Sequence, residues 1–344
     1  MQIKRRTLLT AGAALAGTSA MGFPALALAQ KKHKWKIQVL WGAGEDTYGM
    51  FQTFCENVTK NTQGVLEITP FAAGAIVGTF ETLDAVSQNV IQGHSTYPGY
   101  FAGKEPALAV IGDFSFGYTE PSQQDDWLRN KGGIEMIRQA YDKHNAYTIG
   151  CTWWGVESLT SKVPLHHPDD FKGLKHRGAQ GLAAETIAKM GASIVVIPGG
   201  EAYSALEKGV VDTVDWSTIS VNEKIGFFEI AKYATYPGFH SMPIQDLTVN
   251  KSAWAALPDD VKATLLKTWD EFSLYQVDTI AKNDVVAAER LKGQGVELID
   301  WSQEDRLHAR KLAHEVWGEW AKKSALAKQA VESQQDYLRE IKLL

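Results

Sequence analysis

Three observations predict an α/β protein of two domains. Apolar segments with the spacing of strands and of helices alternate from residue 35 onward, which is typical of largely parallel sheets with helices on both faces. The chain of 344 residues is long enough for two domains of the usual ~100–200 residues each. The segment 81–91 aligns without a gap on the segment 201–211, and each reads as a short amphipathic helix that runs directly into a strand. The identities are few, so chance similarity is the alternative to an internal repeat.

The first 29 residues read as an export signal. Lys4, Arg5 and Arg6 form a basic start of the twin-arginine type, and a mildly apolar run of Ala, Gly and Leu follows. The run ends in an A-x-A pattern, which predicts cleavage after Ala29 and a mature protein in the periplasm. A membrane anchor is the alternative. However, the run is short and contains glycine, and no later segment holds the roughly 18 consecutive apolar residues that a membrane span needs.

The charge of the mature chain argues against a nucleic-acid partner. Removal of residues 1–29 takes away three positive charges and no acid, so the net charge changes from −5 to −8. A nucleic-acid-binding protein needs a clustered basic face instead. Cys55 and Cys151 are the only cysteines, and they lack the spacing of a zinc site. Because Cys55 lies on the apolar stripe of a predicted helix, we expect two buried free thiols rather than one disulfide.

The first elements follow in β-α-β order. A strand rich in large apolar residues at 35–41 is followed by a turn, 42–46, whose acidic end suits the start of a helix. Apolar residues at helical spacing run from Tyr48 to Val58, and a strand returns at 65–68. In such sheets ligands bind beyond the carboxyl ends of the strands, so the residues at those ends are the candidates for a site.

Arg177 is the leading candidate for a binding residue. It stands at the end of a predicted strand, and a glycine turn and the start of a helix follow it at 178–181. A guanidinium can grip a carboxylate with two parallel hydrogen bonds, and the free N–H groups of a helix start favour an anion. The pattern predicts a carboxylate receptor; the alternative is a solvated surface arginine.

Oxygen-bearing side chains lie at three other strand ends. Glu157 follows the strand 151–154, Asp215 ends the strand 210–214, and Gln245 precedes the strand 247–249. Such ligands suit hard cations like calcium or sodium. Two carboxylates close together without a cation would repel each other and take up a proton. The alternative for each acid is a solvated loop residue.

Taken together, these features resemble the substrate-binding proteins of tripartite ATP-independent periplasmic (TRAP) transporters. The resemblance covers essentially the whole mature chain, and its most specific parts are the Gly-Leu-Lys-x-Arg strand at 173–177 and the segment 207–212. The segments 153–157 and 211–216 are similar to the branch that binds 2-oxo acids such as pyruvate, or lactate, together with a metal cation. The resemblance implies a protein that is not an enzyme and that delivers a small monocarboxylate to the membrane permease subunits.

The resemblance also implies roles for individual residues. Arg177 would grip the substrate carboxylate, and Glu157 would face the substrate. Aromatic walls would exclude water and strengthen that contact; they would be formed by Tyr97, Tyr100, Trp154 and Trp216. One calcium or sodium ion would be held by Glu157, Asp215, the main-chain carbonyl of Trp216 and Gln245. Close relatives often carry glutamine where Glu157 stands, so the extra acid here tilts the expectation toward calcium.

The expected architecture is the two-domain periplasmic binding protein fold (type II-like). One domain holds 30–154 and 245–282, and the other holds 155–244 and 283–344. Helical patterning at 258–291 suggests a long helix that bridges both domains, as the family has. The domains would close around the ligand by a hinge motion.

The competing function is an exported hydrolase or lyase that acts on a small carboxylate or sugar acid. Such an enzyme needs a nucleophile or an acid–base pair in a recognisable setting, and the sequence holds neither a Gly-x-Ser-x-Gly elbow nor a His-Glu-x-x-His helix. The glycines at 42 and 44 lack the third glycine of a dinucleotide fingerprint. Because the histidines at 94, 166, 167 and 240 show no ligand spacing, we expect them to be structural.

The C-terminal segment 303–343 reads as helix throughout. Its apolar stripe advances by mostly three- and four-residue steps through Leu307, Leu312, Val316, Trp317, Trp320, Leu326, Ala330, Tyr337 and Ile341. An unbroken helix would extend about 60 Å, far more than one domain of this size covers. It must therefore break near 322–324 and fold back, or pack on a second chain. We expect a homodimer with this segment at its interface, as in some members of the 2-oxo acid branch; the alternative is a kinked helix on its own chain.

Overall fold

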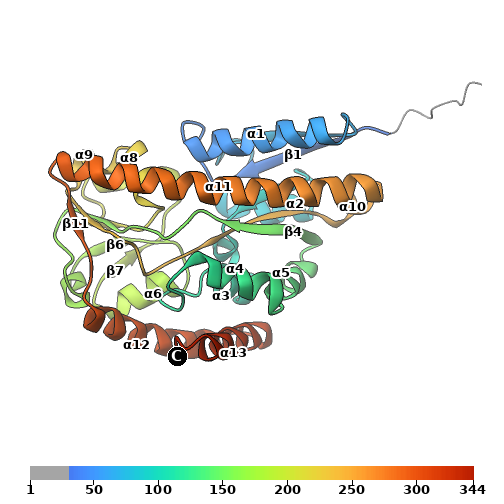
Figure 1. The fold of residues 1–344 in the computed structure, drawn as a ribbon. Coiled ribbons are helices and arrows are strands. Elements are labelled where there is room, and N and C mark those ends of the chain that lie inside the picture. The colour runs from blue at the N-terminus through green and yellow to red at the C-terminus, as the bar shows by residue number, and fades with distance from the viewer. Residues whose placement is uncertain (1–30) are drawn as a thin grey trace, which may run out of the picture. The chain divides into compact units, whose positions relative to one another are not determined.

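The computed structural model describes residues 31–344, so the predicted export signal and its cleavage site lie outside the described residues. The described chain forms two β-sheets with helices packed around them, as the predicted α/β class requires (Figure 1). Among these residues, no helix combines the length and the hydropathy of a membrane span.

The first sheet has five strands in the order β2-β1-β3-β10-β4. β1 (His33–Val39) pairs in parallel with β2 (Leu66–Phe71) and β3 (Gly93–Thr96), whereas β10 (Ile244–Asn250) runs antiparallel between β3 and β4 (Ala146–Trp153). The helices of this part are α1 (Asp46–Asn61), α2 (Thr82–Ser87), α3 (Ala107–Gly112), α4 (Pro121–Asn130) and α5 (Gly133–Asp142). Cys55 on α1 and Cys151 on β4 are both buried and free, which confirms the predicted thiols.

The second sheet has six strands in the order β11-β9-β5-β8-β6-β7. The strands are β5 (Thr160–Ser161), β6 (Lys175–Arg177), β7 (Ser193–Val195), β8 (Thr213–Val214), β9 (Tyr233–Thr235) and β11 (Glu297–Ile299). All pairs are parallel except the two made by β5 with β8 and β9. The helices between these strands are α6 (Leu182–Lys189), α7 (Ala202–Glu207), α8 (Ile219–Lys224) and α9 (Phe227–Ile230).

The chain crosses between the sheets three times; the third crossing, from β10 to β11, runs through a long helix, and the first two lead into the strands that make the antiparallel pairs. The first crossing segment, 154–159, leads from β4 to β5, and the second, 236–243, leads from β9 to β10. Each of the strands β5 and β10 is therefore entered from the opposite sheet and runs against its neighbours. The two crossing segments also bond to each other, because the amide of Glu157 donates to the carbonyl of Ser241 over 3.0 Å.

A single long helix accompanies both sheets. α11 (Asp259–Gly293) closely matches the helix that the sequence predicts at 258–291. It packs against α1 and β4 of the first sheet and against α8 and β11 of the second sheet (Figure 1).

The two aligned segments, 81–91 and 201–211, have the same local structure. A 3₁₀ turn (Thr79–Glu81) precedes α2, and an equivalent turn (Gly199–Glu201) precedes α7. Each helix has six residues and leads to a parallel strand, β3 or β8. The aligned residues Asn89 and Gly209 both adopt a left-handed backbone, with φ of 59° and 70°. Glycine and asparagine commonly take this conformation just after a helix, so the match adds one more shared feature to the order of turn, helix and strand.

The C-terminal segment breaks where the sequence predicts and folds back on its own chain. α12 (Gln303–Trp320) and α13 (Ala325–Glu340) are separated by 321–324, and the side chain of Ser324 caps α13 by accepting from the amide of Ala327. α12 packs on α6, and α13 packs on α3 and α5. The residues of the apolar stripe from Val316 to Tyr337 are buried within the chain. The stripe is thus covered by the chain itself, as in the alternative of a kinked helix, and the homodimer stays a prediction.

Truncation of the chain after Ala321 is expected to destabilise the fold rather than an oligomer. The deleted helix fills core positions with Ala330 and Leu338, which are fully buried, and Gln334 donates to the carbonyl of Val110 over 3.0 Å. Exposing these surfaces should lower the midpoint of thermal unfolding of the truncated protein by well over 10 °C, since several buried side chains at about 1.5–3 kcal/mol each are lost together. A truncated chain that melts with the parent would contradict this packing.

Candidate ligand-binding site

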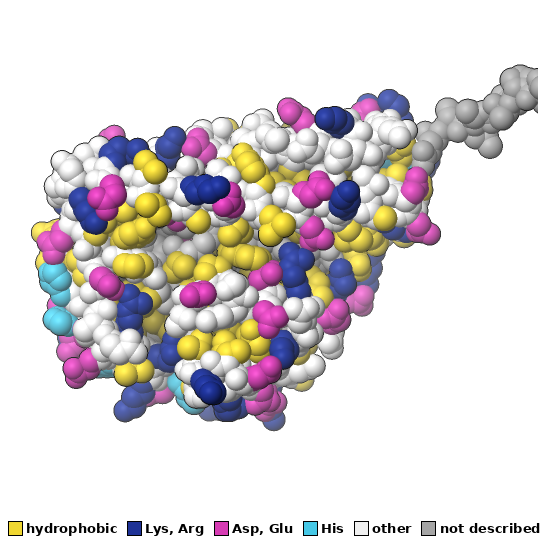
Figure 2. Space-filling view, in the orientation of Figure 1, with side chains coloured by type: hydrophobic (Ala, Val, Ile, Leu, Met, Phe, Trp, Pro, Cys, Tyr) yellow, Lys and Arg dark blue, Asp and Glu magenta, His cyan; other side chains and the backbone are white. Residues whose placement is uncertain are grey.

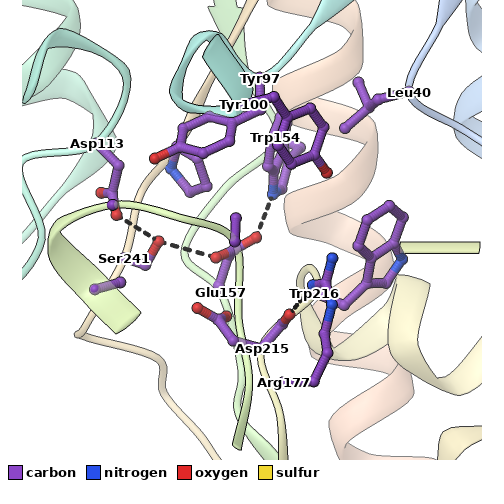
Figure 3. A pocket seen from close by; sticks show the side chains of 14 residues that line it. Leu40, Tyr97, Tyr100, Asp113, Trp154, Glu157, Arg177, Asp215, Trp216 and Ser241 are labelled. Carbon is purple, nitrogen blue, oxygen red and sulfur yellow. Dashed lines mark hydrogen bonds between the residues drawn. The ribbon is translucent and has the colours of Figure 1, made fainter. Parts of the chain in front are cut away.

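A small cavity, with about 30 Å³ of space for groups the size of a water molecule, lies where strand ends of the two sheets meet (Figure 3). Its lining includes every side chain that the sequence predicts for the site except Gln245. The lining residues are Leu40, Tyr97, Tyr100, Asp113, Trp154, Glu157, Arg177, Ala179, Gly181, Ala183, Asp215, Trp216, Ser241 and Pro243.

Strand ends supply most of these residues. Leu40 follows β1, Tyr97 follows β3 and Trp154 follows β4 in the first sheet, while Arg177 ends β6 and Asp215 follows β8 in the second. This is the edge at which open α/β sheets bind ligands, because the chain leaves each strand there and is free to present side chains.

Arg177 is buried, with 2% of its surface exposed, and its guanidinium is held by backbone carbonyls. Nε and Nη2 donate to the carbonyl of Ile197 over 3.2 and 2.9 Å, and Nη1 donates to the carbonyl of Asp215. The guanidinium lies 5.2 Å from the ring centre of Trp216. No carboxylate among the described residues forms an ion pair with it. Since a guanidinium has five N–H donors, two are not used by these carbonyls, the number that a bidentate carboxylate needs, and Tyr100 is the side chain close to them.

Glu157 and Asp215 face each other inside the cavity. With His240 they form a cluster in which one ligand atom from each residue lies within 4.8 Å of the others. Burial, with Asp215 beside it, raises the pKa of Glu157 well above its usual range. Burial alone would also raise the pKa of Asp215, but His240, whose Nε2 lies 3.1 Å from Asp215 Oδ1, outweighs burial and holds that pKa below its usual range. Glu157 therefore binds a proton more tightly than Asp215 does.

A third buried acid, Asp113, completes this cluster and was not predicted. The hydroxyl of Ser241 lies 2.9 Å from Asp113 Oδ2 and 2.9 Å from Glu157 Oε2, so it links the two acids (Figure 3). Burial raises the pKa of Asp113 above its usual range. Three carboxyl groups and one guanidinium thus share a small, largely desolvated space.

The sequence does not identify Asp113, Ser241 or His240 as site residues. Asp113 follows α3 in an otherwise apolar run, and an acid inside such a run is the signal that could have revealed it. His240 and Ser241 lie on the second crossing segment, which has no strand periodicity to suggest its place. His240, which the sequence analysis expects to be structural, contacts the predicted site residue Asp215.

Aromatic rings form the wall of the cavity, as predicted. Trp41, which was not predicted, packs edge-on against Trp154 and Trp216, with ring centres 5.1 and 5.8 Å away. The indole N–H of Trp154 donates to Glu157 Oε1 over 3.2 Å. Tyr97 and Tyr100 pack edge-on against each other, with ring centres 5.4 Å apart.

Gln245 is not brought to the cavity. Its amide oxygen accepts from the indole of Trp41 over 3.3 Å and from Gln276 over 3.2 Å, and its amide nitrogen donates to Ser95 over 2.7 Å. The side chain is completely buried in this polar network. The sequence-based grouping of Gln245 with Glu157 and Asp215 is thus not seen in this structure.

Comparisons with known proteins agree on one kind of protein. Residues 38–324 match the family described as bacterial extracellular solute-binding protein, family 7. A monocarboxylate 2-oxoacid-binding periplasmic protein of Nostoc sp. is 31% identical over 310 residues, which is 90% of this chain and 85% of the relative.

Two crystal structures of TRAP periplasmic solute-binding proteins illustrate the fold. The apo open structure from Rhodobacter sphaeroides is 34% identical and superposes with a TM-score of 0.73, covering 90% of this chain and 99% of that protein. The structure from Colwellia psychrerythraea with bound calcium and pyruvate is 25% identical but superposes better, with a TM-score of 0.81 over 91% of this chain and 96% of that protein. The arrangement of the present chain is thus more similar to the ligand-bound structure than to the open one.

Proposed function

Because the chain belongs to family 7 of the bacterial extracellular solute-binding proteins, we propose that it captures a small monocarboxylate, a 2-oxo acid such as pyruvate or else lactate, for a TRAP transporter. Proteins of this family bind solutes and are not enzymes, so a hydrolase or lyase is not favoured. The observation that carries the proposal is Arg177, a buried guanidinium in the cavity without a carboxylate partner among the described residues.

Arg177 is prepared for a carboxylate before the ligand arrives. The carbonyls of Ile197 and Asp215 fix the plane of the guanidinium, and the ring of Trp216 lies against it. Binding therefore costs little additional ordering of the side chain, and the aromatic walls keep water from competing for the free N–H donors. A burial of this kind without a resident anion is costly, which favours a role in binding over a role in stability.

A cation fits the acidic side of the same cavity. Glu157 and Asp215 offer carboxylate oxygens, and in the proposal the carbonyl of Trp216 completes the protein ligands, with Gln245 added only if its network rearranges. Oxygen donors of this type suit calcium or sodium. His240 contacts Asp215 through nitrogen, so we assign it to orienting this carboxylate rather than to a hard ion. The third acid, Asp113, adds negative charge and favours calcium over sodium.

The two sheets would act as two lobes that close on the ligand. In this proposal residues 30–154 with 245–282 form one domain and residues 155–244 with 283–344 the other, although α13 packs on helices α3 and α5 of the first. Closure buries the acid between Arg177 of one lobe and Tyr97 of the other, and the closed protein would be presented to the TRAP permease subunits in the membrane.

Calorimetry on the mature protein tests the function directly. Pyruvate, lactate and a dicarboxylate such as succinate are titrated in calcium- and sodium-containing buffers, and a turnover assay is run on the same samples. We expect saturable one-to-one binding of a monocarboxylate without chemical change. Turnover of the acid, or absence of binding by every monocarboxylate tested, would overturn the proposal.

Gly199→Ala is expected to weaken ligand binding through Trp216. A Cβ at Gly199 would lie 1.6 Å from Cζ3 of the Trp216 ring, so the ring must leave its present position 5.2 Å from the Arg177 guanidinium. Overpacking of this kind costs about 1–3 kcal/mol, which corresponds to an affinity about 5- to 150-fold lower if it falls on the bound state. Gly200→Ala in the same turn is the matched control, since a Cβ there meets nothing within 4 Å. Equal affinities of the two variants would show that the position of Trp216 does not matter.

A further inference from the structure

A second cavity, which the proposed function does not use, lies on one face of α12. It offers about 340 Å³ of space for groups the size of a water molecule, a volume typical of sites for small molecules. It shares no lining residue with the ligand-binding cavity. We call it the basic pocket, and its lining includes Phe116, Phe239, Arg306, Leu307, Arg310 and Lys342.

The basic pocket carries positive charge without an acid. Arg306, Arg310 and Lys342 line it, whereas no aspartate or glutamate of the described chain does. Arg306 is paired with Asp300, which stands outside the lining, but Lys342 forms no ion pair within residues 31–344. On the face of the molecule shown in Figure 2, by contrast, basic and acidic side chains are intermingled. The pocket is therefore a local excess of positive charge, which an anion would balance.

Arg310 is the cation of this pocket that most needs an anion. Its Nε donates to the carbonyl of Phe116 over 2.8 Å and its Nη1 donates to the carbonyl of Leu343 over 3.1 Å, but no carboxylate of the described chain pairs with it. Burial lowers the pKa of Arg310, since the guanidinium loses water without gaining an acid. The two N–H donors of Nη2 make no bond within the described chain, so they can receive a carboxylate.

Apolar and aromatic side chains lie beside these cations. Leu307 is 54% exposed and lies on the same face of α12 as Arg310, which follows three residues later. The ring centre of Phe239 lies 4.5 Å from the guanidinium of Arg306 and 6.2 Å from the ring centre of Phe116. An inorganic anion would leave the exposed surface of Leu307 in water, whereas an anion with an apolar body would cover it.

We propose that the basic pocket is a second binding site, which takes a small organic carboxylate with an apolar or aromatic body. The carboxylate accepts hydrogen bonds from Nη2 of Arg310 and is attracted by the ammonium group of Lys342, while the apolar body covers Leu307. The two sites are chemically distinct, because the ligand-binding cavity combines its guanidinium with three acids and the basic pocket has none. This assignment does not depend on which acid the first cavity takes.

The same short stretches of chain line both sites. Asp113 lines the ligand-binding cavity, and Phe116, three residues later, lines the basic pocket. Phe239 lines the basic pocket, and Ser241, two residues later, lines the cavity. The amide of Phe116 donates to the carbonyl of His240 over 2.8 Å and joins the two stretches.

This junction links the occupancy of the two sites. An anion bound to Arg310 fixes the Phe116 carbonyl and with it the described arrangement, which is more similar to the ligand-bound crystal structure than to the open one. The second ligand and the monocarboxylate should therefore raise each other's affinity by the same factor. This coupling, unlike the second site itself, rests on the proposed function.

Binding of 4-fluorobenzoate, followed by fluorine NMR, tests the second site. The measurement uses the Arg177→Ala variant, in which the first cavity has lost its guanidinium. We expect one site with a Kd in the millimolar range or tighter, as for other ligands of this size. Neutral 4-fluorobenzamide should bind about tenfold more weakly or worse, because it has the same ring but no charge.

Variants of the lining locate the bound acid. Lys342→Glu should weaken binding of 4-fluorobenzoate about tenfold or more, since an acid then faces the carboxylate; Lys342 is exposed and unpaired, so the fold should not suffer. Lys311→Glu makes the same charge change at an exposed position of α12 outside the pocket and should leave the affinity unchanged. Arg310→Gln should abolish binding, and its thermal unfolding separates a lost site from a damaged fold.

Three results would overturn the second site. They are the absence of binding at about 20 mM 4-fluorobenzoate, equal binding of the benzamide, and equal affinities of Lys342→Glu and Lys311→Glu. For the coupling, calorimetry on the parent protein should find pyruvate bound about twofold or more tightly in the presence of 4-fluorobenzoate. Unchanged or lower affinity for pyruvate would exclude the coupling. A protein that binds 4-fluorobenzoate in the pocket but no monocarboxylate in the cavity would contradict the proposed function alone.

Discussion

Arg177→Ala is expected to abolish measurable binding of the carboxylate ligand while the protein stays folded. The guanidinium makes no ion pair in the described chain, so its removal breaks bonds to the carbonyls of Ile197 and Asp215 only. In the liganded protein, by contrast, it leaves a desolvated carboxylate without its partner. Loss of one side of such a pair costs about 2–5 kcal/mol, or roughly 30- to 5,000-fold in affinity.

Arg177→Lys should be nearly as poor. A single ammonium group cannot hold two carbonyls and also present two parallel donors to the ligand. Arg138→Ala is the matched control, because Arg138 also donates to a backbone carbonyl, that of Thr148 over 3.1 Å, and lies over an aromatic ring, yet stands outside the cavity. If calorimetry finds that Arg177→Ala binds 2-oxo acids with the affinity of the parent, Arg177 is not the carboxylate-binding residue.

Removal of the cation should weaken ligand binding on the order of 10²- to 10³-fold. Without it, the carboxyls of Asp113, Glu157 and Asp215 face an anionic ligand in a space shielded from water. Uncompensated charge at a buried site costs about 3–5 kcal/mol, unless the acids take up protons and lose their hold on the ligand. We expect this loss in chelator if the ion is calcium and in sodium-free buffer if it is sodium.

Variants test whether these particular carboxylates, rather than any buried acid, hold the cation. Asp215→Asn should lose both metal content and ligand affinity, and Glu157→Gln should keep an oxygen donor and shift the preference toward a singly charged ion. Glu105→Gln is the control, because Glu105 is also buried but bonds to Lys143 and Ser324 outside the cavity. Unchanged affinity after exhaustive dialysis under both treatments, with no metal found by elemental analysis, would leave these acids without the proposed role.

The sequence predicts those parts of the site that lie at regular strand ends. Arg177, Asp215 and Trp154 follow or end strands whose apolar residues are visible in the sequence, so the rule about strand ends finds them. Asp113 and Ser241 lie on irregular connections, and only the folded chain brings them together. Gln245 was misjudged because side chains alternate along β10, and the sequence cannot tell which neighbour, here Trp41, takes each polar group.

The C-terminal segment shows a second limit. Its apolar stripe predicts that something covers it, and the length of the stripe predicts the break at 321–324. The stripe itself is equally compatible with α3 and α5 of the same chain or with another copy. Such a choice depends on the distance between elements more than 150 residues apart, which periodicity does not encode.

The crossing segments have a consequence for how this protein can change its specificity. They connect the two sheets, and they also carry three residues that line the cavity, Trp154, Glu157 and Ser241, and His240, which contacts Asp215. Recognition and motion therefore depend on the same few peptide units, and a substitution that retunes the ligand there also alters how readily the lobes part. The two crossing segments pack closely at Gly238, since a Cβ at that position would lie 2.0 Å from the carbonyl oxygen of Glu157. Evolution toward a new acid should thus proceed more freely on the cavity walls outside the crossings, at positions such as Leu40, Ala179 and Ala183, while the crossings stay nearly constant.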